Sequence, residues 1–115
     1  LIDIKTDNKI FTERFDIVVS NPPYVSINDF ETLQPEIKVF EPKYAVTDYS
    51  NGYSFYEIIS STAEKYLESN GLIYFEVGKD QSEKVASILK ENNFNSISII
   101  KDYQQIDRVI KGRKI

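Results

Sequence analysis

The segment Asn21-Pro22-Pro23-Tyr24 combines residue types that could hold a planar NH2 group. Proline has a fixed φ and no N–H, and it restricts the residue before it, so the segment is a rigid turn with carbonyl oxygens free to accept hydrogen bonds. Asn21 adds a side-chain carbonyl oxygen, and Tyr24 adds a flat apolar ring with a polar tip. Two acceptors beside an aromatic ring suit an amide or an exocyclic amine.

The nitrogen of such a group is a poor nucleophile because its lone pair is delocalised. Fixed acceptors for both N–H bonds would orient the nitrogen, favour its loss of planarity and stabilise the positive charge that develops during attack. The attack needs no strong base, which is compatible with a chain that has no His. The alternative is that the segment is only a stiff turn between a strand and a loop.

The composition excludes several other kinds of chemistry. The chain of 115 residues has no Cys and no His, which removes thiolate nucleophiles, disulfides, histidine bases and Cys/His zinc sites. Its 14 basic and 18 acidic residues give a net charge of -4, which disfavours nucleic-acid binding by this segment. The apolar runs are too short to span a bilayer. The lack of Cys favours a reducing, cytoplasmic location.

A predicted strand positions the turn. Residues 15–20 form a short apolar run bounded by polar residues and by the two prolines, which predicts a buried strand. In open α/β sheets ligands bind beyond the carboxyl ends of the strands, where this turn would lie. Residues 25–51 follow as a long irregular stretch, and such loops in compact domains usually serve as lids or binding loops.

The remaining chain alternates helices and strands. The expected elements are a helix from Ser54 to a stop at Asn70-Gly71, a strand over 72–77, a helix beginning at 80–83, and strands over 97–100 and 108–111. Ser54 and Glu57 have the spacing of a capping box. The alternation predicts a mostly parallel α/β sheet covered on both faces. Residues 102–107 are too few for a crossover helix, so the last two strands are expected to be antiparallel.

Residues 15–25 resemble motif IV of the class I S-adenosylmethionine-dependent amino-methyltransferases. Further segments are similar to the HemK/PrmC family of release-factor glutamine methyltransferases: residues 31–37, 40–42, Gly52 with Phe55-Tyr56, 75–78 with Gln81, and 107–113. The resemblance extends over nearly the whole chain and includes the order and spacing of these segments.

This resemblance implies a Rossmann-like class I methyltransferase fold that ends in an antiparallel hairpin. Residues 1–115 would be the C-terminal portion of a single methyltransferase domain. The implied activity is methyl transfer from S-adenosylmethionine to the side-chain amide of the glutamine in the Gly-Gly-Gln motif of peptide-chain release factors. The implied enzyme is thus a protein-glutamine N5-methyltransferase that acts in translation termination, with release factors as its partners.

The resemblance also assigns roles within the turn. Asn21 would accept a hydrogen bond from the target amide through its side chain and would lie close to the cofactor. Pro22 would accept the second N–H through its backbone carbonyl, and Pro23 would hold the turn. Tyr24 would pack against the glutamine side chain. The expected catalytic residues are therefore Asn21, Pro22 and Tyr24, and the whole turn is expected to bind substrate.

Some parts of the family pattern are absent from this chain. The glycine-rich cofactor loop, the acidic residue for the ribose hydroxyls and the N-terminal helical domain have no counterpart, and no G-x-G-x-G occurs. We therefore expect a fragment of a longer protein that by itself is inactive and binds S-adenosylmethionine weakly or not at all. Glu76 could contact the site, although a structural carboxylate at a strand end is the simpler interpretation.

Two alternative functions stay open at this point. One is an adenine amino-methyltransferase that acts on DNA or RNA through a similar Asn-Pro-Pro-aromatic turn and a flipped base. The acidic charge balance and the similarity of residues 31–42 to the release-factor enzymes argue against it. The other is a non-catalytic α/β fragment or assembly partner. Neither the oligomeric state nor the preferred release factor follows from the sequence.

Overall fold

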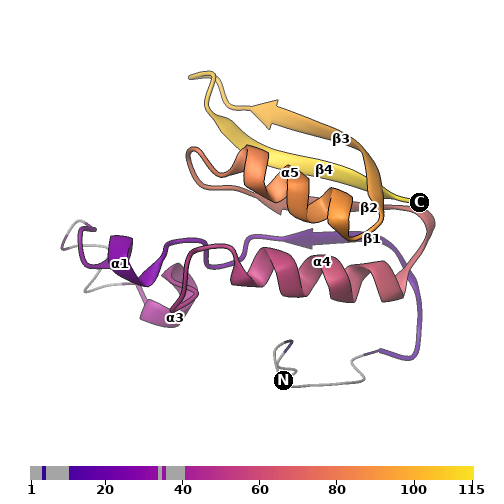
Figure 1. Ribbon diagram of the computed structural model, residues 1–115, viewed down its shortest axis with the longest axis horizontal. Coiled ribbons are helices and arrows are strands. Elements are labelled where there is room, and N and C mark those ends of the chain that lie inside the picture. Colours follow the sequence, from indigo (N-terminus) through magenta and orange to yellow (C-terminus); the bar gives the residue numbers. More distant parts are fainter. Residues whose placement is uncertain (1–3, 5–10, 34, 36–40) are drawn as a thin grey trace.

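A computed structural model of the chain describes residues 4, 11–33, 35 and 41–115 (Figure 1). Its elements are β1 (Phe15–Ser20), α1 (Ile27–Phe30), α3 (Lys43–Val46), α4 (Ser54–Tyr66), β2 (Leu67–Glu76), α5 (Ser82–Glu91), β3 (Phe94–Lys101) and β4 (Asp107–Lys114). The expected alternation of strands and helices is confirmed. Residues 34, 36–37 and 40, which belong to the similarity noted above, lie outside the described residues. Within the described part, no helix has the length and apolar character that crossing a membrane requires.

The four strands form one sheet in the order β1-β2-β4-β3. β1 and β2 are parallel, with Val18 opposite Ile73 and Ser20 opposite Phe75. β4 is antiparallel to both of its neighbours, β2 and β3, which confirms the antiparallel final pair. The described sheet is therefore mixed and not mostly parallel, because β4 inserts between β2 and β3. Because β1 and β2 run in the same direction, their carboxyl ends lie at the same edge of the sheet. The turns that follow Ser20 and Glu76 are therefore neighbours.

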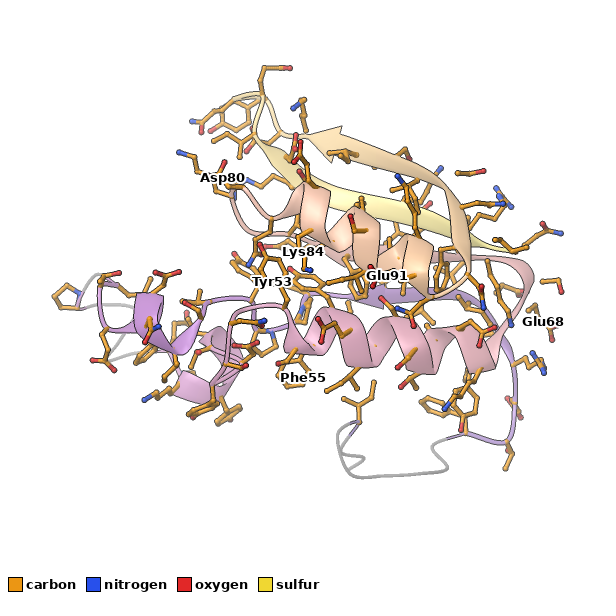
Figure 2. All side chains as sticks on the ribbon, viewed as in Figure 1. Tyr53, Phe55, Glu68, Asp80, Lys84 and Glu91 are labelled. Carbon is orange, nitrogen blue, oxygen red and sulfur yellow. The ribbon has the colours of Figure 1, made fainter. Side chains whose placement is uncertain are left out.

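Helices α4 and α5 pack on the sheet and on each other, so they lie on the same face of it (Figure 1). The core lies between these helices and the sheet. Its buried side chains are Tyr56, Ala63, Leu67, Ile73, Phe75, Val77, Val85, Ile88, Leu89, Phe94 and Ile110. Removal of these apolar side chains from water is the main term that holds the helices on the sheet. Phe55, at the start of α4, points away from the sheet (Figure 2).

The expectation of a buried first strand in a sheet covered on both faces is wrong for the described residues. Val18 packs against the core, but Ile17 is 54% exposed and Val19 is 75% exposed. Alternate residues of a strand point to opposite faces, and α4 and α5 both lie on the face to which Val18 points. β1 is moreover an edge strand of this sheet.

The ends of α4 also differ from the expectation. Tyr53 is the N-cap residue, and Ser54 is already helical, with its Oγ donating a hydrogen bond to Asp48 at 2.8 Å; the predicted capping box does not form. The helix ends at Tyr66, so Asn70 and Gly71 lie within β2. Asn70 has a φ of 66° at a place where the β1–β2 register shifts. The left-handed residue thus interrupts a strand instead of closing a helix. The predicted start of α5 is confirmed, with Gln81 as N-cap.

The described parts of the stretch over residues 25–51 contain more structure than the sequence indicates, including the helices α1 and α3. Val25 and Thr47 form an isolated parallel bridge, which brings the two ends of the stretch together. The Lys43 Nζ lies 5.0 Å from the centre of the Phe30 ring and 5.5 Å from that of Tyr49. These cation–π contacts join α1, α3 and the segment before α4. These described parts of the stretch therefore form a wall beside the end of β1.

Candidate active site

The structure brings all four residues of the predicted turn into one cleft of about 480 Å³. Asn21 is exposed, Pro22 is buried, and Pro23 and Tyr24 are half-buried. Because the chain leaves β1 at Ser20, the turn begins at the carboxyl end of the strand, where ligands of open α/β sheets bind. The opposite wall of the cleft comes from Leu33, Ala45 and Val46 in the folded stretch.

A second hollow, of about 540 Å³, lies beside the first and shares Asn21 and Glu76 with it. Its remaining lining includes the exposed side chains of Ile17 and Val19 on β1 and Val109 on β4. Asn21 thus stands between two hollows, one formed by the turn and one formed by the strand ends. Ligands bound in the two hollows would meet at the Asn21 amide.

Glu76 borders the candidate site; from the sequence, contact with the site was possible but a structural carboxylate was the simpler interpretation. The structure places its exposed side chain at the rim of both hollows. Its backbone carbonyl oxygen accepts the hydrogen bond of the buried Tyr56 hydroxyl at 2.8 Å. The signal that could have found it is positional: Glu76 is the last residue of the strand parallel to β1, so it ends at the same edge as Asn21.

The segment after β2 holds Tyr24 in place. The Gln81 Nε2 donates a hydrogen bond of 2.9 Å to the Tyr24 carbonyl oxygen, and the Gln81 Oε1 accepts one of 2.9 Å from the Gly78 N–H. The Tyr24 ring packs on Gly78, where an added Cβ would come within 2.8 Å of the ring. Sequence reasoning noted Gln81 as part of a similarity but assigned it no contact.

Asp48 organises the loop that faces the turn. Its buried carboxylate accepts hydrogen bonds of 2.8 to 3.1 Å from the N–H groups of Ser50, Gly52 and Ser54 and from the Ser54 hydroxyl. Burial by itself raises the pKa of Asp48, but the hydrogen bonds from Ser54, Ser50 and Gly52 outweigh burial and hold that pKa below its usual value of 3.8. Sequence reasoning missed Asp48, although an acidic residue shortly before a helix is a visible signal.

Gly52 brings this loop close to the Tyr24 backbone. It has a φ of 93°, in the left-handed region that favours glycine. A Cβ at this position would lie 2.6 Å from the Tyr24 carbonyl oxygen. The loop can therefore close against Tyr24 only with glycine here. Among the described residues, no group of acidic side chains could hold a metal ion.

Comparison with solved structures identifies the fold. The chain is similar to a methyltransferase from Pyrococcus furiosus, with a TM-score of 0.53 and 19% identity over 90% of this chain and 43% of that one. At this level of identity the likeness concerns the fold. The fold is thus that of the class I methyltransferases, and the expected Rossmann-like α/β class is confirmed.

Comparison with sequences identifies the family. The model of the Eco57I restriction-modification methylase family matches residues 2–106, and the chain belongs to that family. Among curated proteins, the release factor glutamine methyltransferase of Fusobacterium nucleatum is 48% identical over 101 residues, which cover 88% of this chain and 28% of that protein. Those of Clostridium acetobutylicum and Clostridium botulinum are both 41% identical, over 85% and 97% of this chain and 34% and 40% of their own. The resemblance to the release-factor glutamine methyltransferases is confirmed, and the chain spans well under half the length of these relatives.

Proposed function

We propose that this chain is the amide-binding part of a release-factor glutamine methyltransferase. The protein would transfer a methyl group to the side-chain amide nitrogen of the glutamine in the Gly-Gly-Gln motif of peptide-chain release factors. The observation that carries the proposal is the position of Asn21, an exposed residue that lines both the cleft of the turn and the second hollow. The names of the curated relatives support the same substrate.

The turn provides the chemistry that an amide nucleophile needs. The Asn21 side-chain oxygen accepts one N–H of the target amide, and the Pro22 backbone carbonyl accepts the other. Pro23 keeps the two acceptors in a fixed relation because its φ is fixed. The Tyr24 ring packs against the methylene groups of the glutamine. The acceptors cost no reorganisation when positive charge develops on the nitrogen, so they stabilise the transition state more than the ground state.

S-adenosylmethionine, when bound, supplies the electrophilic methyl group. The residues of this chain fit part of that cofactor: the second hollow has apolar walls at Ile17 and Val19, with Asn21 and Glu76 at its rim. The fit is partial because no glycine-rich loop for the rest of the cofactor occurs in the sequence. We therefore place the remaining cofactor contacts in residues outside this chain.

The share of its relatives' length that the chain spans supports a domain assignment. Residues 1–115 would form the C-terminal portion of one methyltransferase domain, because the chain spans only 28% to 40% of its curated relatives named above. β1 is an edge strand of the described sheet, and the rest of the domain would pack against its unpaired edge. An enzyme that modifies release factors acts in translation termination, which places it in the cytoplasm.

The decisive experiment replaces Asn21 in the full-length protein that contains this chain. Asn21→Ala should reduce the rate of methyl transfer to a release factor by about 100-fold or more, as expected for loss of an oriented transition-state acceptor. Asn95→Ala, at an exposed position of β3, is the matched control and should keep the native rate. An unchanged rate in Asn21→Ala would support the non-catalytic alternative.

A parallel assay on unmethylated DNA tests the second candidate function. The matching family is that of a restriction-modification methylase, which favours this candidate, whereas the identities of 41% and 48% to release factor glutamine methyltransferases favour the release factor. We expect methyl transfer to the release factor and none to DNA. Transfer to DNA alone would establish the adenine amino-methyltransferase in place of our proposal.

A further inference from the structure

We infer that Gln81 is a positioning residue for methyl transfer, because its side-chain amide holds the Tyr24 backbone and thereby the acceptor turn. This inference rests on the proposed function and extends it to a residue that does not touch the substrate. Gln81 lies 57 positions beyond Tyr24 in the sequence, on the segment after β2. It therefore joins the turns that follow the two parallel strands.

Both ends of the Gln81 amide are used, and each meets the partner it requires. The Nε2 group donates to the Tyr24 carbonyl oxygen, and Oε1 accepts from the Gly78 N–H, each over 2.9 Å. A reversed amide would place the carbonyl oxygens of Gln81 and Tyr24 together and two N–H donors together, so the partners determine the orientation. Both the oxygen and the nitrogen of the half-buried Gln81 amide are therefore held by hydrogen bonds.

Capping of its own helix does not explain this side chain. Gln81 is the N-cap residue of α5, yet its side chain makes no capping hydrogen bond. Its backbone carbonyl already accepts the Val85 N–H at 3.0 Å as the first bond of the helix. Gln is also not among the residues preferred for N-capping. The side chain instead reaches away from the helix to Tyr24.

Two glycines, Gly78 and Gly52, pack closely around the contact between Gln81 and Tyr24. A Cβ at Gly78 would lie 2.8 Å from the Gln81 Oε1 and 2.8 Å from the Tyr24 ring. A Cβ at Gly52 would lie 3.3 Å from the Gln81 Nε2 and 2.6 Å from the Tyr24 carbonyl oxygen. Two glycines therefore enclose the contact between Gln81 and Tyr24. Such close packing leaves the Tyr24 peptide little freedom to rotate.

The orientation of that peptide determines where the substrate acceptors point. Tyr24 directly follows Pro22 and Pro23, whose fixed φ angles leave few rotatable bonds between Tyr24 and the acceptors at Pro22 and Asn21, so a displacement of Tyr24 displaces these acceptors too. A small misalignment of these acceptors lowers the rate of the chemical step more than the affinity for substrate. Loss of Gln81 should thus appear in kcat, with KM for the methyl donor nearly unchanged.

The test compares Gln81→Glu and Gln81→Ala in the full-length protein, with Gln104→Glu in the exposed hairpin as matched control. The Gln81→Glu change keeps the acceptor for the Gly78 N–H but replaces the donor to Tyr24 with a second oxygen. We expect Gln81→Glu to lower kcat for release-factor methylation by about 10- to 100-fold near neutral pH, with the donor KM within about threefold of native. Gln104→Glu should match the native protein.

The pH profile separates positioning from a general loss of structure. In the Gln81→Glu variant, the new carboxyl group could donate to the Tyr24 carbonyl when it is protonated, as the native amide does. The kcat of Gln81→Glu relative to native should therefore rise as the pH falls from about 8 to about 6, and that of Gln81→Ala should not. Hydrogen exchange at Gly78 should accelerate in Gln81→Ala, which loses the acceptor.

Two results would overturn the inference. One is a kcat of Gln81→Glu within about twofold of native, and the other is a ratio of the Gln81→Glu kcat to the native kcat that does not change with pH. Failure of the proposed function looks different, because the native protein itself would then not methylate a release factor. Native activity with unaffected Gln81 variants would refute the role of Gln81 alone.

Discussion

The Tyr56 hydroxyl group donates a hydrogen bond of 2.8 Å to the backbone carbonyl oxygen of Glu76. The Tyr56 ring is fully buried and meets Phe75 edge to face, with 5.1 Å between ring centres. Burial raises the pKa of Tyr56 far above its usual value, so the hydroxyl stays protonated and remains a donor. This contact attaches α4 to the end of β2, at the rim of both hollows.

Tyr56→Phe tests that attachment. The variant leaves the Glu76 carbonyl without its partner, so the free energy of unfolding should fall by about 1 to 3 kcal/mol. Urea denaturation of the full-length protein measures the loss. Tyr103→Phe removes the same hydroxyl from a side chain that is 92% exposed and should change the stability by less than about 0.5 kcal/mol. Equal stability of the two variants would contradict the importance of the buried hydrogen bond.

Asp48 should make the stability depend on acid pH. Its pKa in the folded chain lies below the usual value of 3.8, so the carboxylate stabilises the fold above that value, and the contribution is lost as the pH falls through the folded pKa. Asp48→Asn should lower the free energy of unfolding near neutral pH. The difference in this free energy between the variant and the native protein should be smaller below about pH 4. Urea denaturation at both pH values measures this change.

The matched control for Asp48 is Asp80→Asn, since Asp80 lies in the turn before α5 and points away from the core (Figure 2). This variant removes one carboxylate without touching the loop beside Tyr24, and it should retain the native acid dependence. The free energy of unfolding of Asp48→Asn could instead differ from native by the same amount near neutral pH and in acid. In that case the hydrogen bonds to the Asp48 carboxylate would not be the source of the acid dependence of stability.

Gly78→Ala should disturb the turn through sterics alone. The new Cβ would lie 2.8 Å from the Tyr24 ring, so the ring must move away from its place in the cleft. We expect methyl transfer to fall by about tenfold or more and the stability by about 1 to 3 kcal/mol. A transfer assay and urea denaturation report the two effects. The neighbouring exposed position supplies the control, Lys79→Ala, which should behave as native. Full activity in Gly78→Ala would show that methyl transfer does not depend on the position of the Tyr24 ring.

Calorimetric titration of the isolated chain with S-adenosylmethionine tests the division of the cofactor site. Binding should be weak or absent, because the hollow beside β1 fits only part of the cofactor and the sequence has no glycine-rich loop for the rest. The full-length protein serves as the positive control. Micromolar binding by residues 1–115 alone would show that the cofactor contacts in this chain are sufficient.

Local features of the fold were predictable because they depend on neighbouring residues. The apolar run before two prolines predicted β1, and the polar start and apolar stripe predicted α5. The ends of α4 were not predictable in the same way. Ser54 has the spacing of a capping box, but its hydroxyl bonds to Asp48, which lies six positions earlier in a folded loop. Asn70 looks like the end of a helix, but pairing with β1 extends a strand through it.

The sequence by itself determined the rigid backbone of the turn, because proline restricts its own backbone and that of Asn21 regardless of what lies nearby. The tertiary structure alone decided which residues support that turn. Glu76 reaches the site because β1 and β2 are parallel, and Gln81 reaches Tyr24 because the turns after these strands share one edge of the sheet. Such contacts follow from strand order and direction, which local conformational preference does not specify.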